Sequence, residues 1–216
     1  MHKFETLKAK HRMGRDTFDE AFSIRMHRAL SWLERAEKEK TDPDAAFIFF
    51  WISFNANYSI QADSANSFSE TEQFKRFFDL IIKCDTSSQI YELVWARFTN
   101  EIRSILNNQY IYSFFWKMCS DTIGDGWINS FENSKKLFNS ALAKKDTSLI
   151  LQILFSRLYT LRNQFIHGNA TWNSAVNRSQ VNDGFKLISA LQPSFLSIMM
   201  EHHREDWGDL AFPIIE

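Results

Sequence analysis

The feature that most constrains the fold is an almost uninterrupted apolar run at residues 45–54, which contains a single serine and ends at Asn55. Asp42 and Pro43 precede the run, and this pair is typical of a helix N-cap followed by the first helical residue. The run therefore predicts a helix at about residues 44–58 that is apolar on nearly every side. Because such a helix offers no face to water, we expect it to be the central element that other helices surround.

The same run is too short to cross a membrane, since a spanning helix needs ~20 apolar residues and this one is about half as long. Residues 1–8 carry scattered charges and lack the apolar core and small-residue cleavage site of a secretory signal. Cys84 and Cys119 form no C-x-x-C pair, so we expect reduced thiols rather than a disulfide framework. These features predict a soluble, cytoplasmic protein without a membrane partner.

Residues that interrupt helices are scarce, because the 216 residues include only 6 Gly and 3 Pro, against 21 Phe and 7 Trp. All-β and loop-rich folds need more turn residues, so the sequence predicts an all-α fold with large buried rings. Apolar residues at helical spacing indicate about seven helices. These cover residues 18–33, 44–58, 74–82, 90–106, 127–143, 147–167 and 180–203. In the first of them, Arg25 is expected to face away from the apolar stripe.

We expect a single domain over residues 1–216, because no repeat, linker or low-complexity tract divides the chain. Its core is expected at about residues 17–204, with an N-terminal arm at 1–16 and a C-terminal tail at 205–216. The net charge is −1 at pH 7. The chain therefore lacks the global positive field that would hold a nucleic-acid backbone, and any RNA contact must be local.

One helix carries a polar group in an unusual place. When residues 147–167 are placed on a helical wheel, Arg162 falls inside the apolar half. A guanidinium is costly to bury alone and cannot shed its charge, so this position predicts either a carboxylate partner or an anionic ligand. A buried structural ion pair and a functional site explain Arg162 equally well at this point.

Asn163 and His167 lie on the opposite, polar side of the same wheel. They are four residues apart, so they share a face and can share a ligand. His167 belongs to the last turn, at the negative end of the helix dipole, which suits a general acid. Gly168 follows directly and predicts the end of the helix. Arg162 and His167 are roughly 140° apart on a regular helix, so they converge only if the helix end loosens or a second chain supplies one of them.

The segment R-N-Q-F-I-H-G at residues 162–168 resembles the R-x4-H motif of the HEPN superfamily, small α-helical proteins that include many metal-independent RNases. Residues 47–56, 168–181, 205–208 and 212–213 resemble the Apea-like HEPN branch of bacterial proteins. The resemblance therefore spans nearly the entire chain. It implies a helical bundle of HEPN type.

In that family, the motif arginine, the polar residue after it and the histidine form the nuclease site, which implies catalytic roles for Arg162, Asn163 and His167. The family usually forms homodimers in which two motifs face each other across an RNA groove, so the resemblance implies an RNA substrate and a homodimer. It also suggests toxin–antitoxin or anti-phage defence, with an antitoxin protein as a further partner. Some HEPN toxins are adenylylated on a tyrosine two residues after the histidine, and Asn169 stands there instead.

These residues suggest a hypothesis: an endoribonuclease that requires neither a metal nor another cofactor. The motif offers an imidazole, a guanidinium and an amide without carboxylates at metal-ligand spacing. His167 would activate the ribose 2′-hydroxyl or protonate the leaving oxygen, Arg162 would hold the phosphate, and Asn163 would orient the substrate or the imidazole. Two alternatives remain open. In the first, the fold is a non-catalytic binding module for RNA, a nucleotide or a protein. In the second, Arg162 and His167 are ordinary packing residues.

Further candidates for substrate binding follow the motif. Trp172, Asn173, Asn177 and Arg178 are close enough to line the same groove, where a ring could stack on a base and Arg178 could meet a phosphate. Loop capping and packing explain them nearly as well. Asn55 interrupts the most apolar helix, where its amide either supports the site or is satisfied within the core.

Other segments carry weaker signals. Residues 201–206 read E-H-H-R-E-D, but adjacent histidines point about 100° apart on a helix, so we expect a solvated helix end rather than a metal site. The glycines and aspartates at residues 121–126 predict a loop that lacks the D-x-D-x-D-G calcium pattern. The usual motifs of nucleotide hydrolysis, dinucleotide binding, ester hydrolysis and zinc proteolysis are also missing from the sequence.

Overall fold

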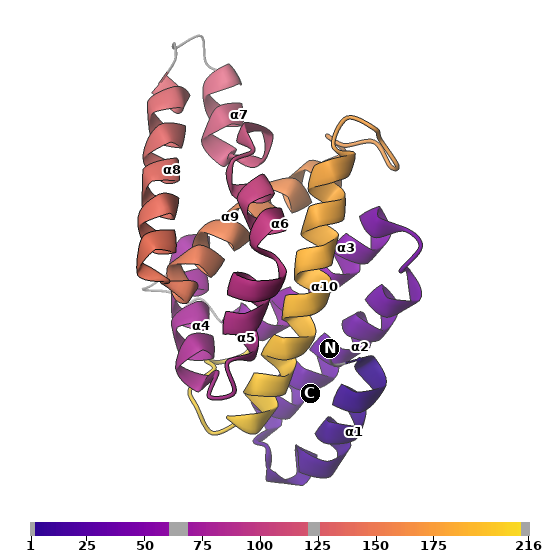
Figure 1. Cartoon of the computed structure of the whole chain (residues 1–216). Coiled ribbons are helices and arrows are strands. Elements are labelled where there is room, and N and C mark those ends of the chain that lie inside the picture. The colour runs from indigo at the N-terminus through magenta and orange to yellow at the C-terminus, as the bar shows by residue number, and fades with distance from the viewer. Residues whose placement is uncertain (1–2, 61–68, 121–125, 213–216) are drawn as a thin grey trace.

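The computed structural model describes residues 3–60, 69–120 and 126–212, and side chains are not described at 118–120. Within these ranges the chain forms ten α-helices and an isolated β-bridge between Ile60 and Leu210 (Figure 1). The predicted all-α class is therefore confirmed. The helices are α1 (Phe4–Gly14), α2 (Glu20–Lys38), α3 (Pro43–Tyr58), α4 (Glu70–Cys84), α5 (Gln89–Glu92), α6 (Thr99–Leu106), α7 (Ser113–Ser120), α8 (Gly126–Lys144), α9 (Thr147–Ile166) and α10 (Arg178–Glu201).

Three differences account for ten helices where the sequence predicted about seven. The N-terminal arm forms α1, which packs on α2 and α10 and buries Leu7 completely. The aromatic stretch before the predicted loop forms α7. The segment predicted as one helix at residues 90–106 is split into α5 and α6 by a π-helical turn at Leu93–Arg97. Shorter 3₁₀ turns lie at Arg15–Thr17 and Gln109–Ile111.

Helix α3 occupies the centre of the bundle, as its sequence predicts. The Asp42 side chain caps its first turn by accepting hydrogen bonds from two backbone amides, and Pro43 is its first residue. The Phe54 ring contacts aromatic rings of α4, α9 and α10, with centroid separations of 4.4 to 6.1 Å. On the remaining side, the Ser53 hydroxyl donates to the backbone carbonyl of Ala29 in α2, at 2.7 Å. Four helices therefore surround α3.

Arg25 is the clearest departure from the predicted pattern of burial. Its side chain is only 1% exposed, although its place on the α2 wheel suggested the outer face. The guanidinium donates hydrogen bonds to five backbone carbonyls at the end of α3 and in the C-terminal tail, those of Ala56, Asn57, Ser59, Gly208 and Asp209. Burial lowers the pKa of Arg25 to about 10. This arginine neutralises the carbonyl end of α3 and fastens the tail to the bundle.

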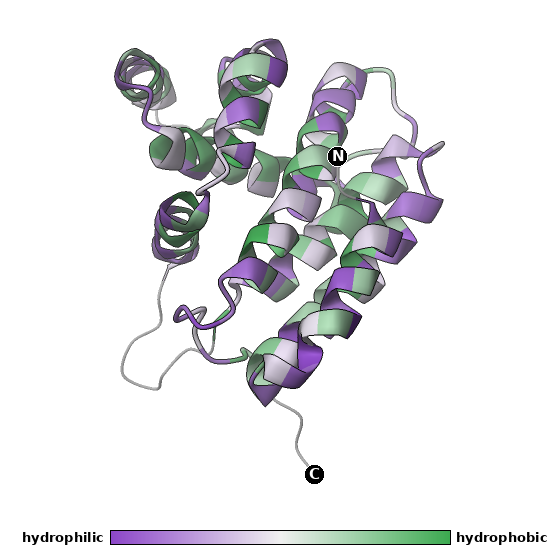
Figure 2. Cartoon of the chain, turned by 60° about the horizontal axis from the view of Figure 1, so that its bottom comes forward, coloured by the Kyte–Doolittle hydropathy of each residue, from purple (hydrophilic) through white to green (hydrophobic). Residues whose placement is uncertain are grey.

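Close contact between α10 and α9 positions the end of α9. A Cβ atom at Gly184 would lie 3.2 Å from a Leu161 methyl carbon and 3.3 Å from both Leu158 and Phe47 side chains. Glycine therefore lets α10 approach α9 next to residue 162. Helix α8 packs against α9, and α7 packs against α8 (Figure 1). Hydrophilic residues gather on the outer faces and connections of the bundle (Figure 2).

Candidate functional site

The helix that carries the motif ends as the sequence predicts. Helix α9 stops at Ile166, and His167 is its C-cap residue. Gly168 follows with a φ of +69°, a conformation that favours glycine. The Gly168 amide donates to the carbonyl of Phe165 at 3.0 Å, and the Asn169 amide donates to that of Gln164 at 2.8 Å. These two bonds form a Schellman motif, which fixes the position at which the chain leaves α9.

Arg162 lies half-buried and donates from Nη1 to the Oδ1 atom of Asn163, at 3.0 Å. Among the described residues, no carboxylate lies within ion-pair distance of its guanidinium. Its positive charge is close enough to Tyr58 to act on the pKa of that hydroxyl. The anionic partner that the wheel predicts is therefore missing from the described part of the chain, and a neutral amide oxygen takes its place.

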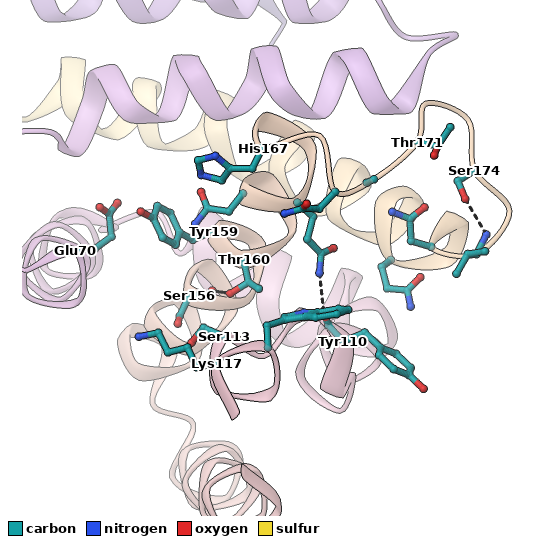
Figure 3. A pocket seen from close by; sticks show the side chains of 18 of the residues that line it. Glu70, Tyr110, Ser113, Lys117, Ser156, Tyr159, Thr160, His167, Thr171 and Ser174 are labelled. Carbon is teal, nitrogen blue, oxygen red and sulfur yellow. Dashed lines mark hydrogen bonds between the residues drawn. The ribbon is translucent and has the colours of Figure 1, made fainter. Parts of the chain in front are cut away.

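Asn163 and His167 line the same cleft, consistent with their four-residue spacing. The cleft has a volume of about 1140 Å³ and lies between the start of α4, α7, the second half of α9 and the loop after the motif. Arg162 is not among its lining residues. Figure 3 shows His167 near Tyr159, whose hydroxyl points toward Glu70, with Ser113 and Lys117 across the cleft. Asn163 and His167 thus open to the cleft, whereas Arg162 lies outside it.

Glu70 is a charged residue of the cleft that sequence reasoning missed. It is the first residue of α4, behind the Ser69 N-cap, and it accepts a hydrogen bond from the buried Tyr58 hydroxyl. Burial raises the pKa of Tyr58, and the charge of Glu70 raises it further. The sequence does contain a signal for the position of Glu70, because Ser69 and Glu72 form a capping box that fixes where α4 begins.

The loop after the motif is attached to the start of α3. The bidentate ion pair between Arg178 and Asp44 has nitrogen–oxygen distances of 2.8 and 3.0 Å. The backbone amide of Asn173 donates to the same Asp44 carboxylate at 2.6 Å, and the Trp172 indole donates to Asp42 at 2.8 Å. We call these five residues the loop clamp. Asp44 is 4% exposed, so the clamp is anchored in the protein interior.

This arrangement locates the predicted substrate-binding residues. Trp172, Asn173 and Arg178 make the hydrogen bonds of the loop clamp, and the charge of Arg178 is paired with Asp44. Asn177 lines the cleft, and its Oδ1 atom is buried without a hydrogen-bond partner among the described residues. Asn55 is half-buried in α3, does not line the cleft and also has an unpaired Oδ1 atom in the described part of the chain. Their proposed contacts with substrate stay predictions.

The weaker sequence signals resolve in different ways. Cys84 is buried and unpaired, and burial raises the pKa of its thiol. The side chain of Cys119 and most of the predicted loop at 121–126 lie outside the described residues. In the 201–206 segment, Glu201, Glu205 and Asp206 form ion pairs with lysine or arginine side chains. Across the described ranges, no group of three or more His, Cys, Asp or Glu side chains could hold a metal ion.

The fold and the cleft together define an all-α protein with a large cleft at the C-terminal end of one long helix. No protein-family profile, curated protein or solved structure matches the chain. Within residues 3–60, 69–120 and 126–212, none of the helices combines the length and the apolar character that crossing a membrane requires.

Proposed function

We propose that this chain is an HEPN-type endoribonuclease that cleaves RNA without a metal ion and acts as a homodimer. The observation that carries the proposal is the geometry at the end of α9. Asn163 and His167 line a cleft of about 1140 Å³. Arg162, held by Asn163, has no carboxylate partner among the described residues. An imidazole can serve as the acid or base of phosphodiester cleavage, and a cation without an ion pair can offset the charge on the phosphate.

In the proposed reaction, His167 takes the proton of a ribose 2′-hydroxyl, and the 2′-oxygen forms a bond to the adjacent phosphorus. The bond between phosphorus and the 5′-oxygen breaks, and a water molecule gives a proton to that oxygen. Arg162 offsets the charge that develops on the phosphate oxygens. The products are a 2′,3′-cyclic phosphate and a 5′-hydroxyl.

The homodimer is part of the proposal because Arg162 lies outside the cleft that His167 lines in its own chain. Apolar side chains around the motif are exposed, with Ile166 50%, Trp172 69% and Val176 92% accessible, and a second copy would cover them. Mixing the Arg162→Ala and His167→Ala proteins tests this assembly. If each site combines Arg162 of one chain with the partner's His167, the mixture regains activity that neither variant has alone. If the mixture stays inactive, composite sites are ruled out.

The principal experiment incubates the purified protein with labelled RNA in EDTA and identifies the new ends. We expect His167→Ala to lower the cleavage rate by at least about 100-fold, the usual share of a general acid–base group. Matched controls are His27→Ala and Arg204→Ala, which change exposed residues that do not line the cleft. A requirement for magnesium, or full cleavage by His167→Ala, would contradict the proposal.

A second candidate is a binding module without catalysis, and the position of Arg162 favours it. With that guanidinium outside the cleft, a single chain presents His167 without Arg162, the cation that the proposed reaction uses. The same incubation separates the two functions, since a module binds RNA and leaves no new ends. A role in toxin–antitoxin or anti-phage defence, with an antitoxin protein as partner, rests on the family resemblance alone.

A further inference from the structure

The cleft contains an exposed aromatic pair that the proposed chemistry does not use. Tyr110 and Trp116 both line the cleft, and their side chains are 52% and 49% exposed. Tyr110 lies in the 3₁₀ turn before α7, and Trp116 lies in α7. Large aromatic rings normally bury most of their surface, so two half-exposed rings in one cleft require an explanation.

Both rings are fixed relative to the motif. The Trp116 indole nitrogen donates to the backbone carbonyl of Tyr110 at 2.7 Å, and the Gln164 side-chain amide donates to the same carbonyl, also at 2.7 Å. Gln164 directly follows Asn163 in α9. Behind the pair, the Phe115 ring packs edge-on against both, with centroid separations of 5.0 and 5.4 Å. The exposed faces are therefore held in place next to the motif.

Charge alone cannot hold RNA in this cleft. Among its described lining residues, Lys117 is the one lysine or arginine, and Glu70 carries the opposite charge. The whole chain has a net charge of −1. Affinity for RNA that rests on phosphate contacts needs several cations, because each contact contributes through the release of counterions. The bases must therefore supply most of the affinity if RNA binds here.

We infer that Tyr110 and Trp116 form a base-stacking subsite that selects single-stranded RNA and places an unpaired nucleotide beside His167. The inference rests on the proposed function and names the part of the substrate that the cleft recognises. Exposed rings stack on the faces of unpaired bases, which a duplex keeps covered. The cleft volume of about 1140 Å³ exceeds the roughly 300–1000 Å³ of pockets for drug-sized ligands, so it has room for a nucleotide.

The test measures binding apart from cleavage, by fluorescence anisotropy with a labelled 2′-O-methyl oligonucleotide whose 2′-oxygen cannot attack. We expect Trp116→Ala to weaken binding by roughly 5- to 150-fold, the range that stacking on one base supplies, and Trp116→Phe to retain most of it. Trp32→Ala is the matched control, since Trp32 is 38% exposed and stacks on Phe49 outside the cleft. An unchanged dissociation constant for Trp116→Ala, with the fold intact by circular dichroism, overturns the subsite.

Three probes complete the test. An abasic oligonucleotide should bind the parent and Trp116→Ala proteins equally weakly, and a duplex of the same sequence should bind less tightly than the single strand. Equal affinity for duplex and single strand overturns the subsite, as does failure of the parent protein to bind RNA. Cleavage of unmodified RNA is measured alongside. If binding depends on Trp116 and the RNA is not cleaved, the subsite is supported and the nuclease function is ruled out. If cleavage depends on His167 and Trp116→Ala leaves the KM for RNA unchanged, the subsite alone is ruled out.

Discussion

The ion pair between Asp44 and Arg178 should be worth more than a surface salt bridge. Arg178→Ala would leave the Asp44 carboxylate, 4% exposed, with only the backbone amide of Asn173 as a partner in the clamp. Truncating one member of a buried, hydrogen-bonded charge pair costs roughly 2–5 kcal/mol. The Arg178 side chain is 25% exposed, so solvent screening places the expected loss at the lower end, about 2–3 kcal/mol. Asp44→Asn should cost less, about 1–2 kcal/mol, because Arg178 can then turn toward water.

The assay is urea unfolding followed by far-ultraviolet circular dichroism, applied to both single variants and the double variant. The two effects should not add, and the coupling free energy should be about 1–2 kcal/mol. Thermal unfolding of Arg178→Ala should begin about 4–12 °C lower. Arg204→Ala, an exposed arginine outside the clamp, should change stability by less than about 0.5 kcal/mol. A coupling free energy below about 0.5 kcal/mol would refute the reasoning, because the pair would then behave as an exposed one.

Three further predictions concern the core. Burial, and then the charge of Lys8, lowers the pKa of His11, so the unfolded chain takes up a proton first. The contribution of His11 to the free energy of unfolding is therefore complete above the unfolded pKa of about 6.5 and is lost as the pH drops through the folded pKa. In urea titrations at several pH values, His11→Leu should reduce the dependence of the unfolding free energy on pH. Arg25→Lys should cost about 2–4 kcal/mol in thermal unfolding, because a lysine cannot reach five carbonyls, and a loss below about 1 kcal/mol would contradict this. Gly184→Val should cost about 1–3 kcal/mol in urea unfolding through contact with Leu161, and an unchanged midpoint would show that α9 can move away.

Local patterns in the sequence predicted the elements around the site. The apolar run predicted the central α3, Asp42 and Pro43 predicted its start, and Gly168 predicted the end of α9. Each of these features depends on residues within about one turn of one another, where periodicity and capping act. The capping box at Ser69 belongs to the same class, and it would have placed Glu70 at the start of a helix.

Contacts between distant residues could not be predicted in this way. Arg178 pairs with Asp44 across 134 positions, and nothing in either segment marks the other as its partner. Arg25 lay on the polar side of its own wheel, yet the carbonyls of α3 and the tail give it a buried place. For Trp116, the aromatic stretch was visible in the sequence, but the direction of its ring depends on how α7 packs.

Arg162 shows how far a helical wheel can be taken as evidence for a site. The wheel predicted an anionic partner because it placed the guanidinium within an apolar stripe. In the fold this residue is only half-buried and reaches the Asn163 oxygen, so the demand for a carboxylate is smaller than the wheel suggested. Arg162 and the C-cap residue His167 nevertheless face different directions, because His167 lines the cleft and Arg162 does not. Chemistry that needs both groups on one phosphate therefore requires either a rearranged end of α9 or a second copy of the chain.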